Sequence, residues 1–201
     1  TLTLKEMQEE GMKFVGTEGN DVISQNTKVI LDGGAGNDTL TGSSDDDILI
    51  GGTGNDMLNG GIGADTYIVS KGHGHDIIQE KGYWMRLNEQ DTLQFTDVKY
   101  DEVRFRRIRD NLMLHGYNPN DSVTIRNFFA DADNQIENFQ FSDRTLTVKQ
   151  MKEEGMTLVG TSGKDEIMAW GDKCTIDSGL GNDVLIGSSG AETYIFRRGH
   201  G

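Results

Sequence analysis

Residues 33–68 read GGAGNDTLT, GSSDDDILI, GGTGNDMLN and GGIGADTYI in four successive blocks of nine. Each block fits the pattern G-G-x-G-x-D-x-U-x, in which U is a large apolar residue. The sixth position holds Asp38, Asp47, Asp56 and Asp65 in turn. A short period sustained in tandem is typical of a solenoid, in which each unit buries its apolar side chain against its neighbours. This stretch therefore decides the fold.

The same pattern recurs on both sides of this stretch. A weaker copy spans residues 16–24, with Asp21 at the sixth position. Three later blocks, residues 160–168, 178–186 and 187–195, form a second array with Asp165, Asp183 and Glu192 at the sixth position. Residues 1–12 also resemble residues 145–156, so the second array repeats the first with one coil of two blocks removed. It stops in mid-motif, which predicts that the chain is a fragment of a longer protein.

The block chemistry predicts a coil with a charged turn at each end. Glycine at positions one, two and four permits tight turns, and the residues around U suffice for a very short strand with U facing inward. Two blocks then make one coil, so turns of the same parity stack, with Asp38 over Asp56 and Asp47 over Asp65. Stacked carboxylates repel each other unless a cation lies between them. A flexible cage of carboxylate and carbonyl oxygens suits calcium better than magnesium, and zinc would need nitrogen or sulfur ligands.

These blocks resemble the nonapeptide repeats of the RTX (repeats-in-toxin) family. The resemblance implies an all-β fold: right-handed parallel β-roll blocks that hold Ca2+, about three to five ions, between same-side turns. The implied ligands are Asp38 with Asp56, Asp47 with Asp65, and turn carbonyls near Gly34, Gly36, Gly52, Gly54, Gly61 and Gly63. Further implied ligands are Asp76 stacked on Asp56, Asp21 one residue out of register with Asp38, and Asp165 over Asp183. The block with Cys174 at its sixth position, facing Glu192, departs from the family pattern.

Two alternatives without calcium are a disordered acidic linker and a set of metal-free turns. One Gly-Asn-Asp match occurs in many loops, but four in-phase copies and a second array disfavour both alternatives.

The composition limits the classes of partner. The chain of 201 residues has 33 acidic and 19 basic residues, a formal net charge of −14 and 27 glycines. Nucleic acids and anionic membranes are bound by clustered Lys and Arg, so we expect neither as a partner. The sequence has no apolar run of 18 residues and no basic-then-apolar start typical of a secretory signal. With a lone cysteine, Cys174, the chain has no internal disulfide framework.

Residues 80–144 differ from the arrays in composition. They contain most of the aromatic residues of the chain. Apolar and polar residues alternate in them with a period of two, as in Leu93-Gln-Phe95 and Val123-Thr-Ile125. That pattern predicts an antiparallel sheet with one buried face. The segment resembles the haemolysin-type calcium-binding-related domain that recurs between RTX blocks, through DTLQF at 91–95, SVTIRNFF at 122–129 and IENFQFSD at 136–143. We expect it to cap the apolar end of a solenoid.

Two capping boxes, at residues 3–6 and 147–150, predict a short helix before each array, with Leu4, Met7, Val148 and Met151 facing the roll. The predicted organisation has five parts. These are a capping helix at 1–12, the first β-roll block at 13–79, a small antiparallel β-rich capping domain at 80–144, a capping helix at 145–156 and a truncated second β-roll block at 157–201.

Three other features carry less chemistry. His73 and His75 flank Gly74 beside Asp76, but without a third nitrogen or sulfur ligand we expect solvated turn residues. The arginines at 104, 106, 107 and 109 alternate with apolar residues and fit the wet face of a strand better than a binding site for an acidic partner. For Cys174, an inert small side chain is favoured over a link between two chains.

These features predict a non-enzymatic, calcium-binding region of a toxin-like bacterial exoprotein involved in virulence. It would be unfolded at low cytosolic calcium and would fold on extracellular calcium. The resemblance implies export by the type I secretion machinery, so we expect a secreted protein, extracellular or on the bacterial cell surface. We expect a monomer and no membrane insertion. The alternative function is adhesion or host-ligand binding by an RTX adhesin, with residues 80–144 as the binding surface around Tyr83, Trp84 or Phe128. No motif indicates a catalytic residue or an organic cofactor.

Overall fold

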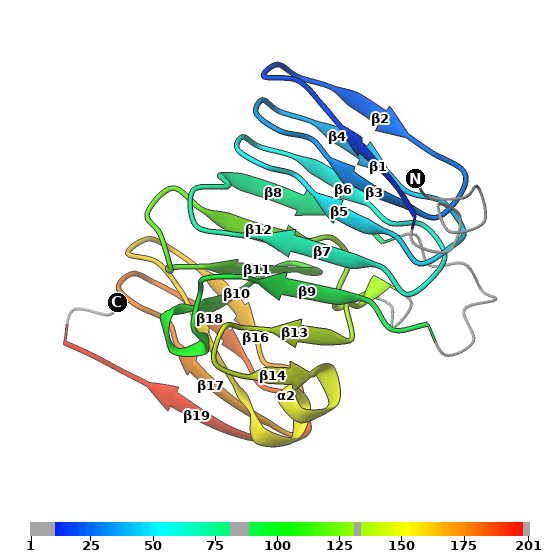
Figure 1. Cartoon of the computed structure of the whole chain (residues 1–201). Helices are drawn as coiled ribbons and strands as arrows, with labels where there is room; N and C mark the ends of the chain where they lie inside the picture. The colour runs from blue at the N-terminus through cyan, green and yellow to red at the C-terminus, as the bar shows by residue number, and fades with distance from the viewer. Residues whose placement is uncertain (1–10, 81–88, 131–133, 199–201) are drawn as a thin grey trace.

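The computed structural model describes residues 11–80, 89–130 and 134–198. Within these ranges the regular structure consists of short strands, one α-helix and one 3-10 turn (Figure 1). The capping helix expected at residues 1–12 falls almost entirely outside the described residues, and the first described strand begins at Met12.

The strands of the first array alternate between two parallel sheets. One sheet contains β1 (Met12–Val15), β3 (Val29–Asp32), β5 (Ile48–Ile50) and β7 (Thr66–Val69); the other contains β2 (Val22–Ser24), β4 (Thr39–Thr41), β6 (Met57–Asn59) and β8 (His75–Ile78). Leu40 is the partner of Leu58, and Leu49 that of Tyr67, so each coil takes two blocks of nine as predicted. The chain thus folds as a parallel β-roll.

The apolar residue at the eighth position of each block fills the inside of the roll. Leu40, Leu49, Leu58 and Tyr67 are fully buried, whereas their neighbours along each strand are at least partly exposed. Burial of such a side chain stabilises the fold by about 1.5–3 kcal/mol. Because each strand is only three or four residues long, the two inward residues of a coil, one from each block, supply most of what the coil buries, and the core of the array is thin.

Residues 80–144, called the aromatic segment from here on, contain strands that continue both sheets of the first array. β9 (Thr92–Phe95) pairs in parallel with β7, and β13 (Asn138–Gln140) pairs in parallel with β9 and antiparallel with β14 (Thr145–Thr147). In the other sheet, β12 (Ser122–Ile125) pairs in parallel with β8 and begins an antiparallel meander with β11 (Asn111–His115) and β10 (Arg104–Ile108). A 3-10 turn, η1 (Tyr100–Glu102), precedes β10.

The predicted antiparallel pairing is found within β10–β12 and β13–β14, but β9, β12 and β13 also pair in parallel and join the two sheets of the roll. β7 and β8 are the last strands of the array, and their outer edges would leave N–H and C=O groups unpaired. β9 and β12 pair with these edges in parallel. A period of two predicts a strand with one buried face and carries no information on which edge the strand will join.

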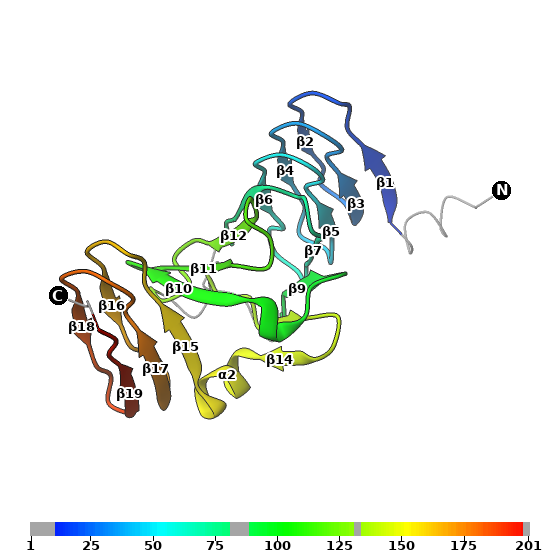
Figure 2. The same cartoon turned by 90° about the vertical axis from the view of Figure 1, so that its left-hand side faces the viewer.

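The second array extends from β10. β15 (Met156–Val159) pairs in parallel with β10 and β17 (Lys173–Asp177), and β17 pairs with β19 (Ala191–Ile195). β16 (Glu166–Met168) and β18 (Val184–Ile186) form the facing sheet. Figure 2 shows the two stacks of coils with the aromatic segment between them. Cys174, in β17, is free and buried, in agreement with an inert role.

A helix precedes the second array, as predicted. α2 (Val148–Glu154) has Thr147 as its N-cap: the N–H of Gln150 donates to Thr147 Oγ1 (3.1 Å), and the Thr147 N–H donates to Gln150 Oε1 (2.8 Å). Val148 and Met151 are buried, so the predicted face of this helix is the one that packs. The helix therefore fills the corner between β14 and β15.

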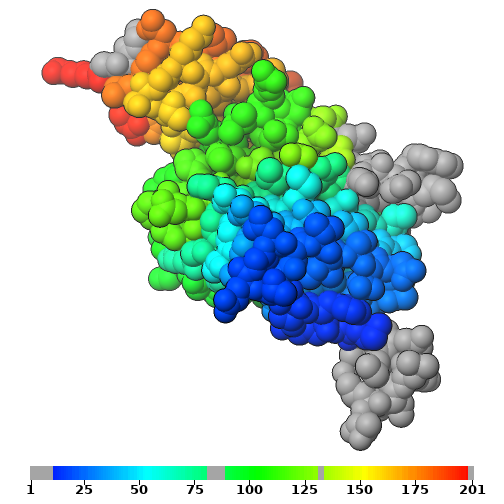
Figure 3. All heavy atoms as spheres, turned by 90° about the horizontal axis from the view of Figure 1, so that it is seen from above, coloured from blue at the N-terminus to red at the C-terminus, as the bar shows by residue number. Residues whose placement is uncertain are grey.

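Aromatic side chains hold the middle of the molecule together. Phe95 packs against Tyr117 and Phe141, and Phe128 contacts Trp170 of the second array, with ring centroids 5.6 Å apart. In the space-filling view the two arrays lie at opposite ends of an elongated molecule (Figure 3). Among the residues described, the only helix is far too short and polar to cross a membrane.

Candidate metal centre

The aspartates at the sixth block position form a ladder along one row of turns. The N–H of Asp21 donates to Oδ1 of Asp38 (2.8 Å), the N–H of Asp38 to Oδ1 of Asp56 (2.8 Å), and the N–H of Asp56 to Oδ1 of Asp76 (3.0 Å). Asp38, Asp56 and Asp76 therefore each use one carboxylate oxygen to hold the preceding coil. The structure brings together all four residues of this row, including Asp21, whose one-residue offset the first coil absorbs.

A second ladder follows the opposite row of turns. The N–H of Val29 donates to Oδ1 of Asp47 (2.7 Å), that of Asp47 to Oδ1 of Asp65 (2.8 Å), and that of Asp65 to Oδ1 of Asp91 (2.9 Å). The N–H of Asp91 in turn donates to Oε2 of Glu137 (2.7 Å). Asp47 and Asp65 were predicted to stack and do so. Asp91 and Glu137, which the repeat pattern did not predict, extend the ladder into the aromatic segment.

The second carboxylate oxygen distinguishes two kinds of turn. Where position two is Ser or Thr, its backbone N–H and hydroxyl donate to Oδ2 of the aspartate in the same block. The donors are Thr17 to Asp21, Ser43 to Asp47 and Thr161 to Asp165. Where position two is Gly, Oδ2 is buried and receives no hydrogen bond from the described part of the chain; these aspartates are Asp38, Asp56, Asp65 and Asp183. A buried carboxylate oxygen without a donor is costly, so these turns are the ones that need a cation.

The glycines of a block have two different tasks, which residues 51–56 illustrate. A Cβ on Gly51 would lie 2.3 Å from Oδ2 of Asp56, so in this block the absence of a side chain at position one leaves room for the carboxylate. Gly52 and Gly54 have φ of 100° and 138°, a region that L side chains rarely adopt. The carbonyls of such turns face inward to the next coil, where the oxygen of Gly34, for example, accepts a hydrogen bond from the N–H of Thr53 (2.9 Å).

The predicted carbonyl ligands all lie in turns of this kind. Positive φ is found at Gly34, Gly36, Gly52, Gly54, Gly61 and Gly63. Gly52 and Gly54 stack on Gly34 and Gly36, close enough that a Cβ would meet the carbonyl oxygen below at 1.9 and 1.8 Å. The glycine turns of successive coils therefore stack closely, in the same blocks that carry the ladder aspartates.

The electrostatics of the ladders are unfavourable without a cation. Burial is the main cause that raises the pKa of the Asp56 carboxyl to about 6, and the charges of Asp76 and Asp38 add to it. For Asp65, burial and repulsion from Asp91 and Glu80 raise the pKa to about 8 despite the hydrogen bond from the Asp47 N–H. Like charges held close together in a buried row favour protonation or a bound cation.

The first ladder ends at a histidine. His73 Nδ1 lies 2.6 Å from Oδ2 of Asp76, and His73 Nε2 lies 2.8 Å from the hydroxyl of Tyr117. The expectation that both turn histidines are solvated is wrong for His73, which is 3% exposed, because the adjacent aromatic segment covers it. His75 is exposed and contacts the hydroxyl of Ser122. Oδ2 of Asp76 thus has His73 as a partner, whereas Oδ2 of Asp38 and Oδ2 of Asp56 have no hydrogen-bond partner among the described residues.

The second array pairs its aspartates in the predicted register. The N–H of Asp165 donates to Oδ1 of Asp183 (2.9 Å). Arg106 also reaches this turn, with Nη2 2.7 Å from Oδ1 of Asp165, so the expectation of a wet strand face is wrong for this arginine. Burial raises the pKa of the Asp165 carboxyl, but its bonds to Thr161 and the Arg106 charge outweigh burial, and the pKa lies below its ordinary value.

The donor set fits calcium. In the described residues, the turns supply carboxylate and carbonyl oxygens, without the thiolate or paired imidazole ligands that zinc prefers. Calcium would bring a positive charge to the four buried Oδ2 atoms that receive no hydrogen bond from the described chain.

A parallel β-roll with acidic ladders along its turns defines a class of calcium-binding repeat protein. Comparison with known families agrees with that class: the model of the RTX calcium-binding nonapeptide repeat (4 copies) matches residues 32–67 and 175–201. The model of the haemolysin-type calcium binding protein related domain matches residues 111–146. The chain therefore carries RTX calcium-binding nonapeptide repeats together with this related domain, and both predicted resemblances are confirmed.

Similar proteins include two toxins. RTX-I toxin determinant A from serotypes 1/9 and its counterpart from serotypes 5/10, both of Actinobacillus pleuropneumoniae, are each 32% identical over 150 residues. These matches cover 64% of this chain and 14% of each toxin, so the chain spans only a small part of its relatives' length. Among solved structures, the extracellular lipase LipA from Serratia marcescens matches with a TM-score of 0.37 and 18% identity, over 85% of this chain and 31% of the lipase.

Proposed function

We propose that this chain is a calcium-dependent folding region of a toxin-like exoprotein. The observation that carries the proposal is a set of four buried Oδ2 atoms, to which no described residue donates a hydrogen bond. Two belong to Asp38 and Asp56 in one row of turns, one to Asp65 in the opposite row and one to Asp183 in the second array. Without calcium these carboxylates repel each other and their desolvation is uncompensated. With calcium the same oxygens become ligands, and the coils are held together at their turns.

Mass action gives the scale of the switch. A site with a Kd of about 10⁻⁴ M stabilises the fold by about 1.4 kcal/mol in about 1 mM calcium. Four such sites contribute about 6 kcal/mol, which is comparable with the whole stability of many domains. At cytosolic calcium, orders of magnitude below this Kd, the contribution vanishes. The thin core of the arrays would then not hold the coils together.

This switch suits a protein exported as an unfolded chain. In the proposal the arrays stay open inside the cell, pass through a type I secretion machinery and fold outside as a monomer. The aromatic segment, proposed to span residues 80–144, gives the first array a covered end and gives the second array a strand from which to grow. The toxin relatives support an exoprotein, and the proposed role of this region is structural rather than enzymatic.

Far-UV circular dichroism during a calcium titration tests the proposal. We expect a low β signal in EDTA that rises cooperatively through the submillimolar to millimolar range, whereas magnesium at the same concentration has little effect. A β signal that is the same in EDTA and in calcium would contradict it.

The alternative of an adhesion surface needs exposed aromatic residues on the middle segment. Phe128 is buried against Trp170, and Tyr83 and Trp84 lie outside the described residues. We therefore do not advance adhesion as a second proposal.

A further inference from the structure

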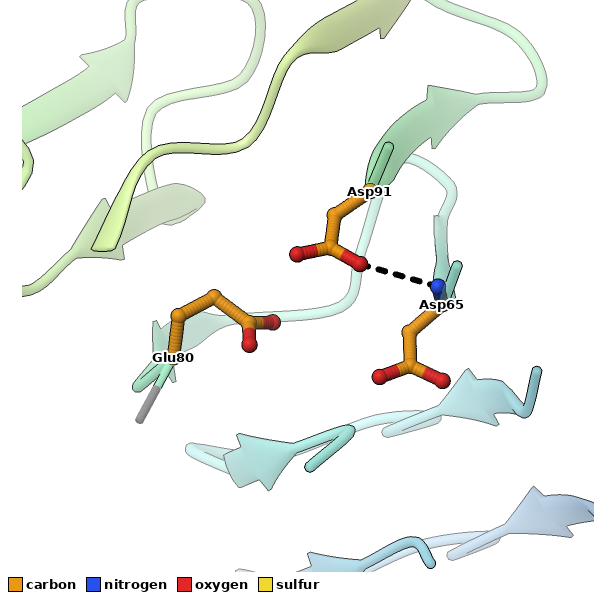
Figure 4. A group of neighbouring side chains, drawn as sticks. All are labelled: Asp65, Glu80 and Asp91. Carbon is orange, nitrogen blue, oxygen red and sulfur yellow. Dashed lines mark hydrogen bonds between the residues drawn. The ribbon is translucent and has the colours of Figure 1, made fainter. Parts of the chain in front are cut away.

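Three carboxylates meet where the first array joins the aromatic segment. Asp65 precedes β7, Glu80 follows β8 and Asp91 precedes β9, so the three residues come from three successive strands of the junction. Each offers an oxygen that lies within 4.8 Å of the others, and Figure 4 shows the three carboxyl groups turned toward one space. Their exposed fractions are 0%, 3% and 0%, so water does not screen their charges.

The surrounding hydrogen bonds fix these carboxylates in place. Oδ1 of Asp91 accepts the N–H of Asp65, and the hydroxyl of Tyr67 donates to Oε1 of Glu80. The same hydroxyl accepts the N–H of Gly60 (2.7 Å). Asp65 Oδ1 accepts the N–H of Asp47, but Asp65 Oδ2, packed against Gly60, is buried with no donor among residues 11–80, 89–130 and 134–198. An unsatisfied oxygen of Asp65 therefore lies beside two further buried carboxylates.

We propose that Asp65, Glu80 and Asp91 bind one calcium ion that fastens the end of the first array to the aromatic segment. The site rests on the proposed calcium dependence but differs from the repeat sites, because two of its three ligands lie outside the nonapeptides. Buried carboxylates this close repel each other, and a bound cation would offset that repulsion. Oxygen ligands alone, including two carboxylates beyond the repeat, favour calcium.

The position of the site gives it a task. β9 pairs with β7 through Thr66 and Thr92, the residues directly after Asp65 and Asp91. An ion that joins these two aspartates therefore stabilises the first strand pair between the roll and its cover. Glu80 adds the end of β8, so the ion would fasten both sheets of the roll at once.

The alternative is a cluster neutralised by shared protons, and the two arrangements respond oppositely to Glu80→Gln. If an ion is bound, the amide replaces a charged ligand and weakens calcium binding. If protons are shared, the amide removes repulsion, and calcium binding is unchanged.

The experiment counts calcium ions on the 201-residue chain by equilibrium dialysis at about 1 mM free calcium, and follows thermal unfolding in the same buffer. For the double variant Glu80→Gln/Asp91→Asn we expect one ion fewer than in the unmodified chain and a lower Tm in calcium. For Glu80→Gln alone we expect at least about tenfold weaker binding of one ion. Asp121→Asn is the matched control: Asp121 is 3% exposed, but Gly72, Gly74 and Asn118 donate to its two oxygens, so the ion count should stay the same.

An unchanged ion count in the double variant, or a Tm that rises in calcium, overturns the proposal. If the double variant does not fold, Tyr67→Phe keeps all three carboxylates and removes the hydroxyl that donates to Glu80 and accepts the Gly60 N–H. The expected result for this variant is weaker binding of one ion, and unaltered binding of every ion counts against the site. The proposed function fails separately, if the unmodified chain gains no β structure on addition of calcium.

Discussion

Nη2 of Arg106 lies 2.7 Å from Oδ1 of Asp165, so a guanidinium group from β10 pairs with the carboxylate in the first turn of the second array. Asp165 also accepts hydrogen bonds from the N–H and the hydroxyl of Thr161 at its other oxygen. This turn therefore has a positive charge supplied by the protein itself. We therefore expect the second array to begin folding on the aromatic segment before any calcium is bound.

Replacement of Arg106 by Gln should raise the calcium concentration needed for folding. The variant loses a charge-assisted hydrogen bond to a carboxylate with a side chain only 5% exposed, which is worth about 1–3 kcal/mol. The measurement is the midpoint of the β signal in a calcium titration. Arg104→Gln is the control, because Arg104 is exposed and its hydrogen bonds within the described part of the chain go to the carbonyls of Asp101 and Val103. Equal midpoints for the two variants would refute the role of Arg106.

The residue at position two of a turn predicts the effect of replacing the aspartate at position six. Asp56→Asn, in a turn with Gly at position two, should lower the ion count and reduce the stability in calcium by at least about 1.4 kcal/mol. In EDTA the same substitution should be neutral or stabilising, because it removes one of several repelling charges. Asp46→Asn, at an exposed carboxylate of the neighbouring block, should leave the ion count unchanged. Denaturant unfolding with and without calcium measures both effects.

For Ser43, at position two of its turn, we expect a substitution to lower stability without loss of a bound ion. Its hydroxyl donates to Oδ2 of Asp47 (3.0 Å) and accepts the N–H of Asp45 (3.0 Å). Ser43→Ala should therefore cost about 1 kcal/mol of stability with the number of bound ions unchanged. The exposed Ser44 provides the control, since Ser44→Ala should have almost no effect. A lost ion in Ser43→Ala would show that the hydroxyl acts through calcium instead.

Acid should partly replace calcium. The pKa of Asp65 is raised to about 8 and that of Asp56 to about 6 in the folded chain, so between the ordinary value of 3.8 and these values the folded state binds more protons than the unfolded state. The metal-free fold therefore loses stability as pH rises through this window and gains it as pH falls. In EDTA we expect more β structure at about pH 5 than at about pH 8. With calcium bound the sign reverses, because protons compete for the ligands. A metal-free β signal that is independent of pH would contradict this prediction.

The period of the sequence was enough to predict the ladders but not their ends. Asp38 and Asp56, or Asp47 and Asp65, are one coil apart by construction, so counting in nines places them together. Asp91 lies 26 residues after Asp65, and the insertion between them breaks the period. The signal for Asp91 was its context, since Asp91-Thr-Leu repeats Asp65-Thr-Tyr.

The remaining partners come from tertiary contacts that no local pattern encodes. Arg106 reaches Asp165 across 59 residues, and His73 is buried because Tyr117 packs on it from 44 residues away. A sequence motif reports which groups a turn contains. Whether a donor arrives from another element depends on how the aromatic segment folds over the end of the roll.

The first glycine of a block offers a test of packing alone. Gly51 has no positive φ, so its need for glycine comes from space: a Cβ there would lie 2.3 Å from Oδ2 of Asp56 and 3.0 Å from its Cβ. Gly51→Ala should displace the carboxylate from the place where it would bind calcium. We expect the free energy of unfolding in calcium to fall by about 1–3 kcal/mol, and one ion to bind more weakly. Gly19→Ala is the matched control, because Gly19 has no positive φ and its nearest neighbour to a new Cβ is Thr17 Oγ1 at 3.9 Å. Thermal unfolding of both variants in calcium measures the difference. If both lose the same stability, the effect comes from the unfolded chain or from backbone freedom, and the contact between glycine and carboxylate does not explain why the block begins with glycine.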